Sequence, residues 1–296
     1  MTSTTPLDNP AIQESRERFL SRQSVIEMRA RERAKAILDD GTFRELLGPF
    51  DRMESPWLSL QDIVPESDDG VVIARGQLDG SPALAMAIEG AFQGGGMGEV
   101  SASKIASALN LARRDCGTGK PILPVLLLET GGVRLQEANL GEAVVAEIHA
   151  EIVALRRHVP IIGVITGMIG CFGGMSITAG LCTYLVALPE SRLELNGPEV
   201  IEQEAGIDEF DASDKRMIWE LMGGQQRYLT GFVDALVEDD VELLKQAIQD
   251  LATRGVPAQH RSEMVEEYMG RLKKIDPTAP PDGTELRNLW ARGDSQ

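Results

Sequence analysis

The run from Ile122 to Leu128 is almost wholly apolar, and no other feature of the sequence restricts the fold as strongly. A strand with one face in water alternates apolar and polar residues, whereas a continuous apolar run is typical of a strand covered on both faces. Shorter runs of the same kind occur at Ile161 to Ile165 and at Tyr184 to Leu188, and helix-like stretches separate the three. Strands that alternate with helices predict an α/β fold.

The stretches around these runs extend the pattern. Turn residues Asp79-Gly80-Ser81-Pro82 join two short apolar runs, which predicts a β-hairpin. Helix formers and apolar spacing predict helices over residues 24–40, 98–114, 137–157, 212–221 and 241–253, with another short strand over 232–237. We therefore expect a helical N-terminal extension over residues 1–60, an α/β domain over 61–255, and a C-terminal helix with a loose, proline-containing tail over 256–296.

Composition narrows the classes of function. The 296 residues include 46 acidic and 29 basic ones, a net charge of −17, and such a surface repels phosphate backbones, so no nucleic-acid partner is expected. The first twenty residues do not resemble a secretory signal and the three cysteines form no CxxC pair, so we expect a cytoplasmic protein with reduced thiols. The charge-free segment from Ile161 to Leu188 contains six glycines, which predict strand, loop, helix and strand rather than a membrane span.

The usual side-chain motifs of catalysis and nucleotide binding are missing from the sequence. His149, His158 and His260 share no ligand spacing, so no metal site is expected, and there is no GxSxG elbow. The run Gly94-Gly95-Gly96-Met97-Gly98-Glu99 lacks the last glycine of a dinucleotide fingerprint, and Gly119-Lys120-Pro121 lacks the hydroxyl residue of a P-loop.

Two glycine pairs remain as candidates for chemistry. Gly131-Gly132 follows the apolar run Ile122 to Leu128, and Gly173-Gly174 follows the run Ile161 to Ile165, each just before a predicted helix. Such junctions expose unpaired backbone N–H groups at the positive end of a helix dipole, and glycine removes the side chain that would keep an anion away. Tight turns also need glycine, but the duplicated arrangement indicates an oxyanion hole.

Four motifs in order resemble a known family. They are residues 92–98 (FQGGGMG), 131–137 (GGVRLQE), 171–174 (CFGG) and 196–203 (NGPEVIEQ). The chain from about Ala30 to Leu251 resembles the acyl-CoA carboxyltransferase branch of the crotonase superfamily, and within it the beta subunits of biotin-independent malonate decarboxylases. The resemblance implies a crotonase-like (ClpP/crotonase) spiral of ββα units. The chain lacks the zinc ribbon of the bacterial acetyl-CoA carboxylase beta subunit and is about half as long as a two-domain carboxyltransferase, so a homologous gamma subunit of the same fold is implied.

The resemblance also implies an activity and a site. A malonyl thioester on the phosphopantetheine-type arm of an acyl carrier protein would lose carbon dioxide and give an acetyl thioester, with no cofactor bound by this chain. The N–H groups of Val133 and Gly173 would stabilise the enolate, and Gly132 and Gly174 would allow close approach. The matched positions expected to bind substrate are Gly131, Arg134, Gly95 and Gly96.

Several alternatives stay open at this point. Arg134 could instead form a structural pair with Glu137 or Glu129. The acidic carrier protein requires a basic docking patch, for which the candidates are Arg113, Arg114 and Lys120 near the predicted mouth, the basic N-terminal helix, or the partner subunit. The same enolate would serve a carboxyltransferase that passes the carboxyl group to biotin, and a non-catalytic scaffold subunit is a third possibility.

Overall fold

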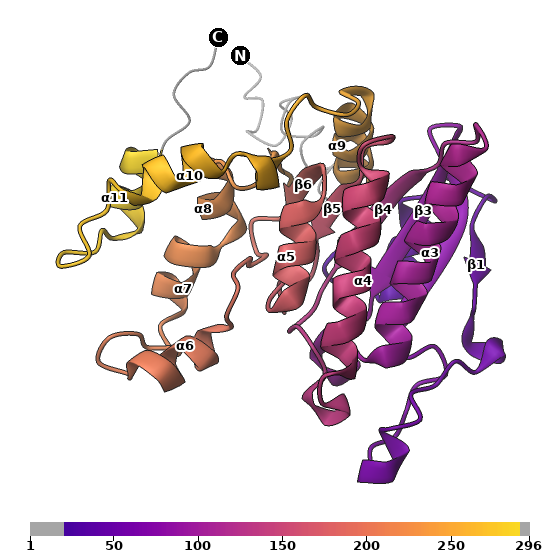
Figure 1. The fold of residues 1–296 in the computed structure, drawn as a ribbon, viewed down its shortest axis with the longest axis horizontal. Coiled ribbons are helices and arrows are strands. Elements are labelled where there is room, and N and C mark those ends of the chain that lie inside the picture. The colour runs from indigo at the N-terminus through magenta and orange to yellow at the C-terminus, as the bar shows by residue number, and fades with distance from the viewer. Residues whose placement is uncertain (1–20, 291–296) are drawn as a thin grey trace, which may run out of the picture.

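A single sheet of seven strands organises the chain, as the computed structural model of residues 21–290 describes it (Figure 1). Spatial order follows chain order from β1 to β7. The first three strands are antiparallel, which confirms the predicted hairpin, and β3 to β7 run parallel. The strands are β1 (Arg44–Leu46), β2 (Val71–Leu78), β3 (Ser81–Ile88), β4 (Leu123–Leu128), β5 (Ile162–Ile165), β6 (Tyr184–Ala187) and β7 (Ala235–Leu236).

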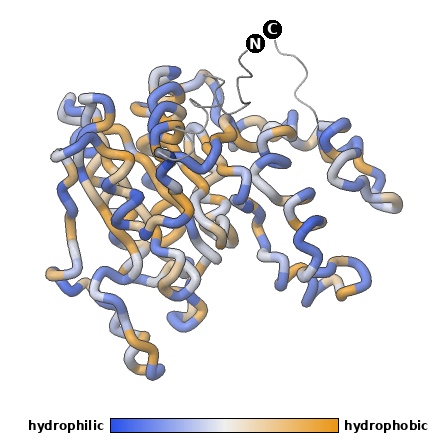
Figure 2. Tube along the Cα trace, turned by 180° about the vertical axis from the view of Figure 1, so that it is seen from behind, coloured by the Kyte–Doolittle hydropathy of each residue, from blue (hydrophilic) through white to orange (hydrophobic). Residues whose placement is uncertain are grey.

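Helices cover both faces of the sheet, as the apolar runs predict. On one face lie α3 (Glu99–Gly117), α4 (Leu140–Leu155) and α5 (Gly174–Leu181); on the other lie α2 (Ala30–Ala36) and α9 (Val241–Thr253). In β4, Leu126 and Leu128 face the first group while Val125 and Leu127 face the second. Apolar residues therefore concentrate along the strands, as Figure 2 shows, and the predicted α/β class is confirmed.

The first predicted helix is shorter than expected. Instead of residues 24–40, only Ala30–Ala36 are helical. Asp239 Oδ1 accepts hydrogen bonds from the backbone N–H groups of Val25 (2.7 Å) and Ile26 (3.0 Å), which holds this stretch in a turn before the helix. The helix's arginines pair within the chain, Arg31 with Glu45 and Asp68, and Arg33 with Glu129, so they do not form a free basic face. The basic residues Arg16 and Arg18, which precede this helix in the sequence, lie outside the described residues.

Beyond the sheet, each parallel unit contributes a second short extended segment before its helix. Met97 bridges to Val133, Thr130 to Cys171, and Cys171 to Leu193, all in parallel. The unit is therefore a sheet strand, a short extended segment that pairs with its neighbours, and a helix. This second layer stacks the loops that follow β3, β4, β5 and β6.

The remaining helices lie to one side of the sheet, beyond β6 (Figure 1). They are α6 (Pro198–Ala205), α7 (Lys215–Met222), α8 (Gly224–Leu229), α10 (Val265–Leu272) and α11 (Gly283–Trp290). Five short 3₁₀ turns complete the described elements: η2 (Pro49–Asp51), η3 (Ser59–Gln61), η4 (Gln93–Gly95), η5 (Leu135–Glu137) and η6 (Arg261–Glu263).

Part of the expected loose tail is ordered. Residues of α11 pack on this group, because Trp290 stacks edge-on against Phe232 with ring centroids 5.8 Å apart and Gln226 Nε2 donates to the Gly283 carbonyl at 2.9 Å. The charge-free segment is divided among β5, α5 and β6, as predicted. Within residues 21–290, no helix combines the length and the apolar character needed to cross a bilayer.

Candidate active site

The two glycine loops meet at the carboxyl ends of β4 and β5. Thr130 N–H donates to the Gly170 carbonyl at 2.8 Å and Phe172 N–H donates to the Thr130 carbonyl at 3.0 Å, so the loops are joined as neighbouring extended segments. A Cβ added to Gly132 would lie 3.3 Å from Gly173 Cα, and one added to Gly173 would lie 3.1 Å from Gly132 Cα. Both glycines have positive φ, +116° and +60°, which side chains rarely adopt.

Two backbone N–H groups at this contact have no partner. Among residues 21–290, no acceptor binds the N–H of Val133 or of Gly174. Gly174 is the first residue of α5, where the helix leaves N–H groups unsatisfied, and Val133 N lies only 3.9 Å from a Cβ built on Gly173. Val133 and Gly174 are each half-buried, so neither residue is sealed inside the core. Unpaired backbone N–H donors on two touching loops are the kind of groups that stabilise a developing oxyanion.

The geometry differs from expectation at Gly173. Its N–H donates to the Leu195 carbonyl at 2.7 Å, on the loop after β6, so this group is already used within the chain. Of the expected donors, Val133 thus keeps an unpaired N–H in this structure, whereas the neighbouring unpaired N–H is that of Gly174 rather than Gly173. Gly173 keeps the other role expected of these glycines, because its missing side chain lets the two loops touch.

The other glycines of the expected site serve the loop framework. Gly95 N–H donates to the Phe92 carbonyl and Gly96 N–H to the Gln93 carbonyl, so neither is available to a substrate. A Cβ on Gly95 would lie 2.1 Å from the Glu129 carbonyl oxygen, which means that this glycine lets the η4 turn pack on the next loop. Gly131 is exposed, and its N–H donates to the Gly94 carbonyl at 2.8 Å.

Arg134 lies inside the protein rather than at the mouth of the loop. Its side chain is 1% exposed, and Nη1 donates to Asp69 Oδ1 and to Glu137 Oε1, both at 2.8 Å. The structural pair with Glu137 is thus the alternative that the geometry supports. Burial raises the pKa of Asp69, whereas the hydrogen bonds from Ser55, the Glu99 N–H and Arg134 outweigh the burial of Glu137 and lower its pKa.

Comparison with known proteins identifies the family. The model of the carboxyl transferase domain matches residues 27–289. The chain belongs to the carboxyl transferase domain family. It is 39% identical over 268 residues to the malonyl-S-ACP:biotin-protein carboxyltransferase MADC of Malonomonas rubra, covering 86% of this chain and 82% of that protein.

Solved structures agree with this assignment. A chain of a Pseudomonas malonate decarboxylase hetero-tetramer in complex with malonate superimposes with a TM-score of 0.90 at 54% identity, covering 93% of this chain and 99% of that chain. A chain of the Pseudomonas malonate decarboxylase MdcD-MdcE hetero-dimer matches with a TM-score of 0.72 at 49% identity, covering 85% and 97%. The carboxyl transferase domain thus has the crotonase-like fold of ββα units that the motifs predict.

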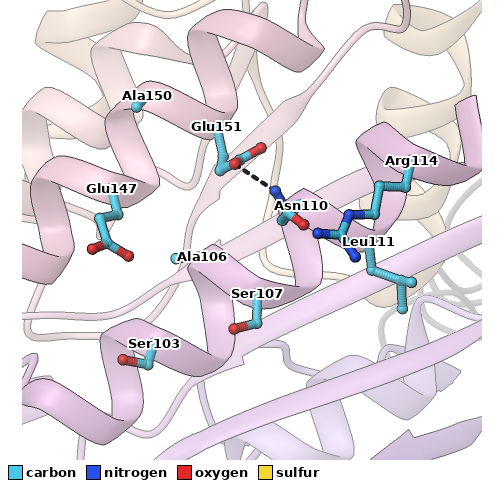
Figure 3. Close-up of a pocket in the computed structure, with 9 residues that line it drawn as sticks. All are labelled: Ser103, Ala106, Ser107, Asn110, Leu111, Arg114, Glu147, Ala150 and Glu151. Atoms are coloured by element: carbon cyan, nitrogen blue, oxygen red, sulfur yellow. Dashed lines mark hydrogen bonds between the residues drawn. The ribbon is translucent and has the colours of Figure 1, made fainter. Parts of the chain in front are cut away.

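A prominent groove of the domain lies away from the glycine loops. A groove of about 630 Å³ runs between α3 and α4, and Figure 3 shows Arg114, Asn110 and Glu151 along it. None of the glycine-loop residues lines this groove. With a helical rise of about 1.5 Å per residue, Arg114 is about 20 Å from the start of α3 beside the loops.

The candidate residues for docking the carrier protein lie away from the glycine loops. Arg113 and Arg114 stand at the far end of α3, and Lys120 precedes β4 rather than following it. Arg113 Nε also donates to Glu151 Oε2 at 2.7 Å, so its charge is matched. None of the three residues therefore lies at the glycine loops, where the mouth was expected.

The sequence reasoning missed two contributors to the site. Asp69 binds Arg134 from a turn that carries no motif, and Leu195 binds the Gly173 N–H from the loop after β6. Among the histidines, His149 lies beside the second glycine loop, with its Nε2 3.0 Å from the Gly174 carbonyl oxygen. Within residues 21–290, no group of three or more His, Cys, Asp or Glu side chains is arranged to hold a metal ion.

Proposed function

We propose that this chain is the subunit of a malonate decarboxylase that stabilises the enolate formed when a malonyl thioester loses carbon dioxide. The observation that carries the proposal is the pair of unpaired N–H groups, Val133 and Gly174, at the contact of two glycine loops. The relatives named above, a malonyl-S-ACP carboxyltransferase and malonate decarboxylase chains, support malonyl thioester as the substrate.

The proposed chemistry needs no side-chain nucleophile. The bond between Cα and the carboxylate carbon breaks, carbon dioxide leaves, and the electron pair moves into the thioester to give an enolate with its charge on oxygen. The Val133 and Gly174 N–H groups donate to that oxygen. A proton from water or from a partner residue then adds to Cα and gives the acetyl thioester. Each such donor lowers the barrier by about 2.7–4 kcal/mol in comparable sites.

The surface around the two glycine loops also bears on how the substrate arrives and which partner covers the site. We infer that the thioester arrives on the phosphopantetheine-type arm of an acyl carrier protein, and that a homologous gamma subunit covers the loops. Exposed apolar side chains lie on the loops after β4, β5 and β6 and on α5, and a group of exposed apolar residues is typical of a subunit interface. These side chains, which we call the apolar rim, are Leu135 (81% exposed), Met168 (54%), Ile177 (47%) and Leu195 (51%).

A steric test addresses the donors, because no substitution deletes a backbone N–H. In the assembled complex, Gly173→Val and Gly132→Val place a branched side chain at the loop contact, and we expect turnover of malonyl carrier protein to fall by about 10²–10³. Gly119→Val is the matched control, since Gly119 also has positive φ (+77°) but nothing within 4 Å of its Cβ position. Unchanged turnover in correctly assembled loop variants would reject the proposal.

Transfer of the carboxyl group to a biotin protein is the second candidate, favoured by the name of the Malonomonas relative. Both reactions pass through the same enolate, so the loops do not distinguish them. Turnover that continues with avidin present supports the simple decarboxylase, whereas inhibition by avidin supports transfer to biotin. A scaffold role predicts instead that blocking the loops of the partner, and not those of this chain, abolishes activity.

A further inference from the structure

A buried cluster of three charged side chains lies directly beside the proposed oxyanion donor. Arg134 follows Val133 in the chain, and its guanidinium is held by Asp69 and Glu137, whose side chains are both 0% exposed. Removing such charges from water is costly, and an apolar cluster of the same volume is often as stable. The stability of the folded chain alone is therefore a weak explanation for three buried charges at this position.

The two carboxylates are fixed by the N-terminus of α3. Glu137 Oε2 accepts the Glu99 N–H at 2.7 Å, and Asp69 Oδ2 accepts the Ser101 N–H at 2.9 Å. Each carboxylate uses its other oxygen for Arg134 Nη1. The guanidinium is thus connected through two carboxylates to one end of a 19-residue helix that packs along the sheet.

The same arginine fixes the backbone on either side of Val133. Arg134 N–H donates to the Met97 carbonyl at 2.9 Å, and Met97 N–H donates to the Gly132 carbonyl at 2.8 Å. Arg134 Nη2 also donates to the Gly96 carbonyl at 3.1 Å, next to Met97. Because the neighbours of Val133 make these bonds, its own N–H faces away from Met97 and remains open.

The cluster also holds two backbone conformations that non-glycine residues rarely adopt. Asp69 has φ +51°, and Ala138, which follows Glu137, has φ 50° and ψ −127°. Such conformations persist where the surrounding contacts impose them, and they gather at functional sites. One of them belongs to a carboxylate of the cluster, and the other directly follows the second carboxylate.

We propose that Asp69, Arg134 and Glu137 are positioning residues that hold the Val133 N–H at the oxyanion. The inference rests on the proposed function, in which this N–H binds the enolate oxygen. A donor that shifts by a fraction of an ångström still allows the carrier and thioester to bind, but it stabilises the developing charge less. Disturbing the cluster should therefore lower kcat and leave KM nearly unchanged.

The test uses the assembled complex with malonyl carrier protein. Glu137→Gln keeps the shape of the side chain and removes its charge. Arg134→Lys keeps the positive charge but loses the planar guanidinium that donates from both Nη1 and Nη2. We expect both variants to assemble with a kcat lowered by about 10–100-fold and a KM within about twofold of the native value. Arg75→Met, which removes the ion pair between Arg75 of β2 and Asp115 near the far end of α3, is the matched control and should leave both constants unchanged.

The outcomes separate the two proposals. If assembled Glu137→Gln and Arg134→Lys complexes keep the native kcat, or if kcat falls only with the amount of assembled complex, the positioning role is overturned. If Gly173→Val complexes also keep the native kcat, the proposed oxyanion role of the loops is rejected, and the positioning role that depends on it is rejected with it. A fall in kcat for the loop variants alone rejects the positioning role and keeps the proposed function.

Discussion

At the scale of single residues, His149 shows how a buried side chain supports the loop that carries a proposed donor. Nε2 of His149, on α4, lies 3.0 Å from the Gly174 carbonyl oxygen. A carbonyl only accepts hydrogen bonds, so Nε2 carries the hydrogen. Burial lowers the pKa of His149, because the charged imidazolium loses its hydration there, while the bond to Gly174 opposes this.

The lowered pKa predicts a dependence of stability on pH. Below the unfolded-state pKa of about 6.5, the unfolded chain binds more protons at this histidine than the folded chain. The free energy of unfolding should therefore decrease as the pH falls from about 7 toward 5, with His149 contributing to the slope. Urea unfolding of the full chain across this range tests the prediction. His149→Gln, which is neutral at every pH, should show a shallower decrease, and an identical slope would contradict it.

At the scale of elements, the η4 turn depends on how closely its backbone approaches the neighbouring loop. Gly94 and Gly95 are adjacent and have nearly the same φ, +63° and +67°. A Cβ on Gly94 would meet nothing within 4 Å, whereas one on Gly95 would overlap the Glu129 carbonyl oxygen at 2.1 Å. Substituting each glycine in turn therefore separates two contributions to the free energy of unfolding: the cost of a left-handed backbone conformation and the cost of a steric clash with the neighbouring loop.

Alanine substitutions should reproduce that difference. Gly94→Ala should lower the free energy of unfolding by about 1–2 kcal/mol, the cost of a left-handed conformation for a residue with Cβ. Gly95→Ala should cost about 1–3 kcal/mol more, because the loops must separate to accommodate the methyl group. Chemical denaturation of the two variants and the native chain measures both values. Equal destabilisation would mean that the turn does not pack as described.

At the scale of the whole molecule, the proposed donors lie on an open surface rather than in a closed cavity. Gly131 is exposed and Val133, Gly173 and Gly174 are half-buried, and the exposed side chains of the apolar rim lie on the same loops and on α5. An enolate in open water would lose much of the benefit of two hydrogen bonds, because water screens and competes for them. The site as proposed is therefore complete only when another subunit covers the rim.

A charge on the apolar rim should weaken assembly. Leu135→Asp should reduce association with the partner subunit, since burying a carboxylate at an apolar contact is unfavourable. Leu111→Asp is the control: Leu111 is also exposed, at 40%, but it lines the groove between α3 and α4. Size-exclusion chromatography of co-expressed subunits measures assembly. Native assembly of Leu135→Asp would show that the partner binds elsewhere.

The sequence by itself determined six of the seven described strands, all except β1, and the family. The apolar runs at Ile122 to Leu128 and Tyr184 to Leu188 became β4 and β6 to within a residue, and α9 begins and ends where its pattern predicts. These elements follow local periodicity because burial on one or both faces selects residues at fixed spacing. The four motifs identified the family for the same reason, because each is a short run of neighbouring residues that can be read directly from the sequence.

Only the tertiary structure decided which groups of the site remain free. The acceptor of the Gly173 N–H is Leu195, the carboxylate beside Arg134 is Asp69, and the start of α2 is set by Asp239, 214 positions from Val25. Each of these partners is distant in sequence and carries no motif of its own. A backbone N–H is available to a substrate only if no such partner reaches it, and that depends on how the loops stack in space.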